Sequence, residues 1–188
     1  PLGALDKGYV CLSCDDGAVP LATYTIPMLI SKNVPCTLSL WSTSAVFTDY
    51  TSTIVDAIQN HGCELGQHGN QIWAEENGDI AYTESKLNEF FDSEEVFWNT
   101  LGLVPRCAVC PAHYNNALVR AVAGGRFGVV RSGLDYVENH YTYYSSGARS
   151  NMFGISSQNV NGGSLDYWKA AIDYAYENHK ILNIYWHD

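Results

Sequence analysis

Two adjacent carboxylates at the end of an apolar segment are the clearest chemical feature of this sequence. Asp15 and Asp16 follow the apolar residues 9–14 and precede Gly17. An apolar run of this length predicts a buried strand. Neighbouring side chains diverge at a strand end, so one carboxylate can bind a metal ion while the other stays free as a base. Gly17 lets the chain turn away, although an Asp-Gly pair taken alone more often marks an ordinary turn.

Two histidines stand at the ends of other strand-like segments. His68 follows the short segment 63–66, and His187 follows the apolar segment 181–186. In a barrel of parallel strands all C-terminal strand ends meet on one face, where residues distant in sequence converge. A single histidine is usually an ordinary polar group. The combination of three such strand ends therefore predicts a site, rather than either histidine by itself.

Longer segments around these residues form recognisable motifs. Ser13-Cys14-Asp15-Asp16-Gly17 is similar to (T/S)-F-D-D-G, residues 64–73 to E-(I/L)-G-x-H with a second His, residues 111–116 to P-Y-G-x-x-N, and residues 184–187 to a strand ending in His. In this order the chain resembles the polysaccharide deacetylases, the family 4 carbohydrate esterases. The resemblance extends over nearly the whole chain and implies a distorted, incomplete (β/α)7 TIM-like barrel.

The resemblance also implies roles for single residues. Asp15 would be the catalytic base and His187 the acid, with Asp16 and His68 holding one divalent metal ion, Zn, Co, Ni or Mn. The backbone N-H near Ala112 would stabilise the oxyanion. The candidate accessory residues are His113, Asn116 and Arg131. His113 departs from the motif, which has Gly there, and is a candidate for a substitute metal ligand, whereas Arg131 matches an Arg found in one branch of the family.

The implied activity is a metal-dependent hydrolase that removes N- or O-acetyl groups from a glycan of the peptidoglycan, chitooligosaccharide or xylan type. Ile72 stands about where the family has its second metal-binding His, and isoleucine cannot bind metal. Two alternatives therefore remain open. One is a non-catalytic carbohydrate-binding domain of the same fold in a surface or phage-tail protein, and the other is a related C-N hydrolase acting on a small cyclic amide.

Composition narrows the class of partner. The 188 residues suit one domain, residues 8–188, after a lead-in of residues 1–7, and a formal charge of -10 argues against nucleic acid. No apolar run approaches the roughly 20 residues of a membrane span. Aromatic residues make up 13% of the chain and suit an acetylated carbohydrate, because rings pack on the C-H faces of sugars. The substrate-binding candidates at predicted strand ends are Trp41, Trp73 and Trp186.

Location follows only indirectly from the sequence. The implied substrate favours an extracellular, cell-surface or virion-associated protein, with any targeting segment removed before residue 1, whereas six cysteines weakly indicate a reducing setting.

Two C-x-x-C pairs, Cys11/Cys14 and Cys107/Cys110, have the spacing of zinc ligands. Residues three apart in extended runs point to opposite faces. We therefore expect six buried thiols and no zinc at these pairs.

Apolar runs alternate with helical patterns throughout the chain, which predicts an α/β fold. The predicted strands are residues 8–14, 35–40, 63–66, 106–111, 127–131, 152–156 and 181–187. Apolar residues at helical spacing predict core-facing helices around 26–30, 54–58, 87–101, 118–122 and 165–175, the last with Ser164 as N-cap. Residues 135–150 have no period and are expected to form a long loop over the active face.

Overall fold

The computed structural model of the chain describes residues 6–69, 83–111, 117–134, 143–144, 155–159 and 163–187. The strands in these ranges are β1 (Tyr9–Asp15), β2 (Thr37–Leu40), β3 (Glu64–His68), β4 (Cys107–Val109), β5 (Val130–Leu134), β6 (Tyr143–Tyr144), β7 (Ile155–Asn159) and β8 (Ile181–His187). The helices are η1 (Leu21–Thr25, a π-helix), α1 (Ile26–Lys32), α2 (Val46–Asp49), α3 (Thr51–Asn60), α4 (Glu84–Thr100), α5 (Ala117–Phe127) and α6 (Leu165–Glu177).

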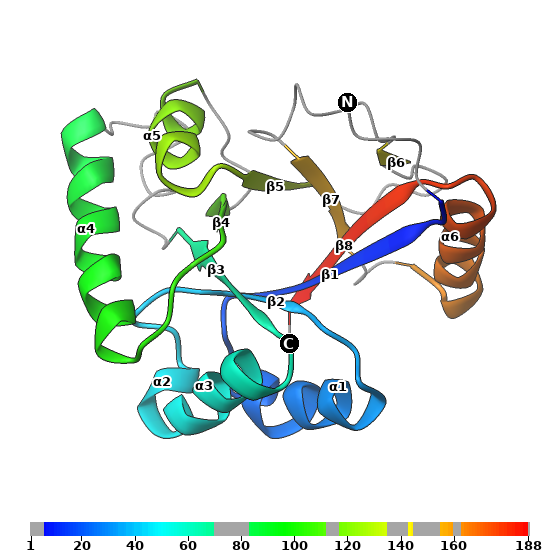
Figure 1. Ribbon diagram of the computed structural model, residues 1–188, viewed down its shortest axis with the longest axis horizontal. Coiled ribbons are helices and arrows are strands. Elements are labelled where there is room, and N and C mark those ends of the chain that lie inside the picture. The colour runs from blue at the N-terminus through cyan, green and yellow to red at the C-terminus, as the bar shows by residue number, and fades with distance from the viewer. Residues whose placement is uncertain are drawn as a thin grey trace.

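Parallel strands close into a ring in the order β1, β2, β3, β4, β5, β7, β8 and back to β1. The described helices lie outside this ring (Figure 1). The ring is distorted at β4, which pairs with β5 only at Ala108↔Val130 and Val109↔Arg131, whereas β1 and β8 pair along their whole lengths. A TIM barrel has eight strands. The predicted incomplete (β/α)7 TIM-like barrel is therefore confirmed.

Each predicted strand has a counterpart, but β5 and β7 begin later than the predicted 127–131 and 152–156. For β5 the cause is helix α5, which continues to Phe127. The Phe127 ring packs edge-on against Phe91 of α4, with ring centroids 5.3 Å apart. Gly128 then ends the helix with φ +72°, the left-handed conformation that glycine adopts most easily. Packing of α5 against α4 thus keeps Phe127 in the helix, although the local pattern assigned this residue to the strand.

Strand β6 corrects the expectation for residues 135–150. Tyr143 and Tyr144 pair antiparallel with Leu182 and Ile181, at the start of β8. That is the end of the barrel opposite His187, so these two residues do not cover the active face. The other residues of the predicted loop lie outside the described ranges.

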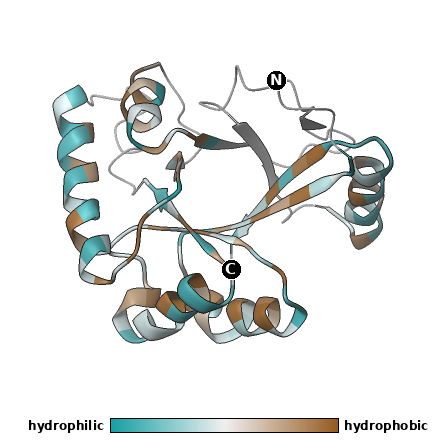
Figure 2. Ribbon diagram, in the orientation of Figure 1, coloured by the Kyte–Doolittle hydropathy of each residue, from teal (hydrophilic) through white to brown (hydrophobic). Residues whose placement is uncertain are grey.

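The hydrophobic core lies between the barrel and the helices. Its largest cluster joins Leu38, Leu40 and Leu65 on the strands with Ile54 and Trp98 on α3 and α4. Helix α4 carries hydrophobic residues among hydrophilic ones, as a helix with one face on a core does (Figure 2). No helix in the described ranges is long and apolar enough to cross a membrane.

Strand residues alternate between the two faces of the sheet, and several of the described side chains that face the barrel interior are polar. Hydrogen bonds join Ser13, Asp15 and Ser39 inside the ring, and Arg131 lies over the Tyr185 ring there. Branched apolar residues usually fill a TIM barrel. In this barrel, polar side chains instead surround Asp15, at the end where the predicted catalytic residues lie.

Helix α6 agrees with its predicted start, and its predicted core-facing stripe, Leu165, Trp168, Ile172 and Ala175, is confirmed only in part. The Ser164 side chain accepts a hydrogen bond from the backbone N-H of Tyr167, as an N-cap residue does. Leu165 is 70% exposed and Ile172 is 40% exposed, so these two residues are not core-facing. The helix buries Trp168 and Ala175, as predicted, and also Ala171.

The cysteines are free thiols, as expected, but two of them depart from the predicted burial. Cys14, Cys36, Cys63 and Cys110 are buried and Cys107 is intermediate, but Cys11 is exposed. Burial raises the pKa of Cys107 to about 11 and that of Cys110 to about 12. These two thiols are therefore protonated at neutral pH.

Candidate functional site

Asp15 is the last residue of β1 and faces the barrel interior. It is only 3% exposed. Nη2 of Arg131 donates to both of its carboxylate oxygens, at 2.6 and 2.5 Å, and Oγ of Ser13 donates to Oδ1 at 3.0 Å. Oγ of Ser39 lies 2.9 Å from Oγ of Ser13 and completes the chain of hydrogen bonds. The carboxylate is thus fixed in one orientation by charged and neutral donors.

Arg131 reaches Asp15 because of the strand register. It pairs with Val109 of β4, which in turn pairs with His68 of β3, so these three side chains face the same way along the barrel wall. The guanidinium carbon lies 5.0 Å from the centre of the Tyr185 ring, within range of a cation-π contact. Arg131, which the resemblance gave as an accessory residue, thus contacts Asp15 directly.

The surroundings of Asp15 have opposing effects on its pKa. Burial disfavours the charged carboxylate and acts to raise the pKa, but the charges of Arg131 and His68 and the hydrogen bonds from Arg131 and Ser39 outweigh burial and lower it. The Asp15 carboxylate is consequently ionised at neutral pH, and its lowered pKa makes it a weak base. A weak base is matched to a proton donor that is itself unusually acidic.

Asp16 adopts a left-handed backbone conformation, with φ 72°, which turns its half-exposed side chain toward two histidines. Its Oδ1 lies 3.6 Å from Nε2 of His68, and its Oδ2 lies 3.7 Å from Nε2 of His187. Gly17 follows with φ +70°, and a Cβ there would lie 2.6 Å from Cδ2 of Leu40. Glycine is therefore required at this turn, and strained backbone of this kind is concentrated at functional sites.

His68 ends β3 and is 5% exposed. Its Nδ1 lies 2.5 Å from the carbonyl oxygen of Gly69, so Nδ1-H donates there and Nε2 is left without a proton. Burial lowers the pKa of His68, although the charges of Asp15 and Asp16 act against this. A neutral imidazole whose free nitrogen faces a carboxylate is the form that binds metal ions.

The spacing of Asp16 and His68 fits a shared divalent ion. Ligands about 2.0–2.2 Å from a tetrahedral ion lie roughly 3.4 Å from one another, close to the 3.6 Å between these two atoms. Within the part of the chain that the structure describes, no group of three or more His, Cys, Asp or Glu side chains is arranged to hold a metal ion. Asp16 and His68 are therefore candidates for two of the ligands of a divalent ion. Ile72 lies outside the described ranges.

The predicted aromatic and accessory residues have different outcomes. Trp41, in the loop after β2, lies beside His68 with ring centroids 5.3 Å apart. Trp186 packs against the core cluster between the sheet and the helices, so its placement does not support a substrate-binding role. The remaining candidates lie outside the described residues: Trp73, Ala112, His113 and Asn116.

Sequence reasoning missed three residues that support the site. Ser13 could have been found from the two-residue period of β1, because it faces the same side of the strand as Asp15. Glu94 falls in the apolar stripe of α4 that also contains Leu87, Phe91 and Trp98, and a carboxylate in such a stripe is a signal. Ser39 has no comparable signal in the sequence.

Comparison with known proteins identifies the fold. No protein-family model and no curated protein sequence matches the chain. Similar solved structures include the deacetylase PplD from Streptococcus pyogenes in complex with acetate, with TM-score 0.66 and 12% identity over 86% of this chain and 69% of that one. A family 4 carbohydrate esterase from Streptomyces lividans in complex with acetate has TM-score 0.61 and 16% identity over 96% of this chain and 79% of that one. A family 4 acetyl xylan esterase from Clostridium thermocellum in complex with a cobalt ion has TM-score 0.54 and 17% identity over 94% and 87%. The chain therefore has the polysaccharide-deacetylase fold.

Proposed function

We propose that this chain, which has the polysaccharide-deacetylase fold, is a metal-dependent hydrolase that removes acetyl groups from a glycan. The observation that carries the proposal is the position of the Asp16 carboxylate between Nε2 of His68 and Nε2 of His187. Asp15, held by Arg131, lies on the strand next to His187 and in register with it. A fixed carboxylate, a neutral imidazole and a second imidazole at one barrel face are the groups that acyl hydrolysis requires.

Asp16 and His68 would hold a divalent ion, which when bound would polarise the acetyl carbonyl and acidify a water molecule. Asp15 then accepts the proton of the attacking water. Arg131 and Ser13 keep the Asp15 carboxylate ionised and aimed at that position. His187, whose side chain is 36% exposed, protonates the departing amine or alcohol from the open side of the site.

An acetylated glycan fits the surroundings of the site. The Trp41 ring stands beside His68, where it offers an apolar face to the C-H groups of a sugar. The similar structures include a peptidoglycan deacetylase from Bacillus subtilis and an acetyl xylan esterase from Clostridium thermocellum. These similarities support N- or O-acetylated polysaccharides as the substrate class, with Zn, Co, Ni or Mn as candidate ions.

The test combines metal binding with acetate release. Protein purified without chelator is titrated calorimetrically with Zn²⁺ and Co²⁺ and incubated with acetylated chitooligosaccharide, acetylxylan and peptidoglycan. We expect one ion per chain and release of acetate, both lost in Asp16→Ala. Asp173→Ala, which removes an exposed carboxylate on α6, is the matched control and should change neither.

Failure of both measurements would refute the proposal. If the native protein binds no divalent ion at millimolar concentration and releases no acetate, but still binds one of the glycans, the non-catalytic carbohydrate-binding domain replaces it. Acetate release that is unchanged in Asp16→Ala would contradict the assignment of Asp16 as a metal ligand.

A further inference from the structure

Glu94 is a buried carboxylate in the middle of α4. It is 4% exposed and accepts three hydrogen bonds: from the backbone N-H of Ser42 at 2.8 Å, from Oγ of Ser42 at 2.6 Å and from Nε2 of Gln67 at 3.1 Å. No Lys, Arg or His forms an ion pair with it among the described residues. Burial of a carboxylate is costly unless its oxygens are satisfied. These three bonds therefore maintain Glu94 in place.

The bonds of Glu94 end on the two segments that carry the rings of the candidate site. Ser42 directly follows Trp41 in the loop after β2, and Gln67 directly precedes His68 at the end of β3. Gln67 also donates to the backbone carbonyl of His68, at 3.0 Å. One carboxylate thus links the backbone beside Trp41 to the backbone beside His68, whose rings are 5.3 Å apart.

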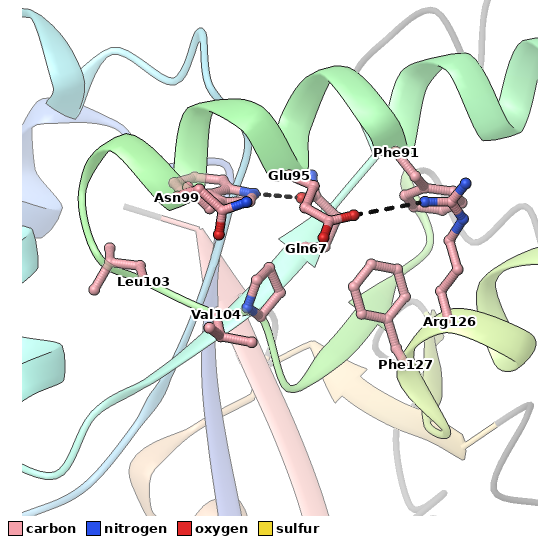
Figure 3. Close-up of a pocket in the computed structure, with 10 residues that line it drawn as sticks. Gln67, Phe91, Glu95, Asn99, Leu103, Val104, Arg126 and Phe127 are labelled. Carbon is pink, nitrogen blue, oxygen red and sulfur yellow. Dashed lines mark hydrogen bonds and ion pairs between the residues drawn. The ribbon is translucent and has the colours of Figure 1, made fainter.

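Gln67 and Glu94 lie on the outer side of β3, away from the reacting groups. Gln67 borders a cavity of about 260 Å³ between α4, α5 and the strands, and Figure 3 shows its side chain pointing toward α4. Nε1 of Trp98 donates to Oε1 of Gln67 at 2.5 Å. Gln67 is only 1% exposed, so its amide cannot bond to water, and its hydrogen bonds to Trp98, Glu94 and the His68 carbonyl fix its orientation.

We propose that Glu94 is a positioning residue for the candidate site. Its carboxylate holds the loop after β2 and the end of β3 in register, and so sets the position of the Trp41 ring relative to His68. The consequence for metal binding and deacetylation rests on the proposed function, whereas the consequence for the geometry of the two rings does not. Glu94 touches neither substrate nor metal ion.

Two substitutions of similar size separate hydrogen bonding from packing. Glu94→Met fills the same space but accepts no strong hydrogen bond. Glu94→Gln can still accept from the Ser42 N-H and from Gln67 through its amide oxygen, while its amide N-H₂ donates to Oγ of Ser42, which can reverse its role. Glu95→Met removes an exposed carboxylate from the adjacent position of the same helix and is the control.

The primary readouts are the crystallographic Trp41–His68 geometry and the dissociation constant for Zn²⁺. We expect Glu94→Met to move the Trp41 ring from its 5.3 Å position and to weaken Zn²⁺ binding by about ten- to a hundredfold, as losses behind a metal ligand commonly do. Glu94→Gln should restore the ring geometry and bind within about tenfold of the native protein. Glu95→Met should match the native protein in both readouts.

A folded Glu94→Met protein with unchanged ring geometry would overturn the proposal, as would a Glu94→Gln protein as impaired as Glu94→Met. If Glu94→Met does not fold, Ser42→Ala decides, because it keeps the carboxylate and removes only the Oγ donor. A displaced Trp41 ring in Ser42→Ala supports the proposal and an unmoved ring refutes it. If the native protein binds no Zn²⁺, the proposed function fails, but the ring geometry still tests the positioning role of Glu94.

Discussion

Replacement of Arg131 by methionine tests whether the buried ion pair holds Asp15 in its charged form. Arg131 is 9% exposed and Asp15 is 3% exposed, so water cannot readily replace the lost guanidinium. Removal of one partner of a buried pair typically costs about 3–5 kcal/mol, because the other charge is left isolated. We expect the free energy of unfolding of Arg131→Met to fall by this amount at pH 7.5.

The size of this loss should depend on pH with a definite sign. In the native protein the pKa of Asp15 lies below its ordinary 3.8, so this group stays ionised between pH 7.5 and pH 5. In Arg131→Met, burial is no longer outweighed and raises the pKa of Asp15, and the loss of a nearby cation also raises the pKa of His68. Both groups of the folded variant then take up protons as the pH falls. The stability gap should narrow by about 1.4 kcal/mol for each unit by which the variant's Asp15 pKa exceeds 5.

Urea unfolding of the native protein and Arg131→Met at pH 7.5 and pH 5 measures both effects. The double variant Asp15→Asn/Arg131→Met has no isolated buried charge at this pair, so it should be more stable than Arg131→Met at pH 7.5. A loss below about 1 kcal/mol at pH 7.5, or a gap that widens at pH 5, would refute the reasoning.

Three further substitutions test the turn and the candidate site. Asp15→Asn should reduce acetate release by at least about a hundredfold while Zn²⁺ affinity in calorimetry is retained, and near-normal turnover would sink the assignment of the base. Gly17→Ala should lower stability by about 1–3 kcal/mol in urea unfolding, because φ is +70° and the new Cβ would lie 2.6 Å from Cδ2 of Leu40. Gly125→Ala on α5, where a Cβ meets nothing within 4 Å, is its control and should not destabilise the protein. Ile72→His should tighten Zn²⁺ binding by at least about tenfold, and an unchanged dissociation constant would mean that residue 72 does not face the ion.

The sequence predicts the places of the reacting groups well, because each lies where an apolar run changes to polar residues. Asp15, His68 and His187 end β1, β3 and β8 in the structure. Parallel strands bring such ends to one face whatever the details of the packing. The convergence of Asp16 with both histidines therefore follows from local patterns and a single assumption about topology.

The contact between Arg131 and Asp15 depends on a register that local patterns do not contain. Strand β5 begins at Val130 rather than at residue 127, because Phe127 packs on α4 as part of α5. A shift of one residue in β5 would turn Arg131 to the outer face of the barrel. The family resemblance indicated which arginine to consider, but the packing of α5 decided that its side chain reaches the barrel interior.

The role of Glu94 could be recognised only in the tertiary structure. The sequence shows only that Glu94 is a carboxylate in the apolar stripe of α4, and it does not identify the partners of that carboxylate. Its partners Ser42 and Gln67 are 52 and 27 residues away, and the strand order brings both to the same side of the sheet. Local sequence determines periodicity, and periodicity determines which residues are buried and where strands end. The choice of partner for a buried polar group is made by the docking of α4 on β2 and β3, since hydrogen bonds require atoms within about 3 Å, and only the assembled fold sets distances of that order.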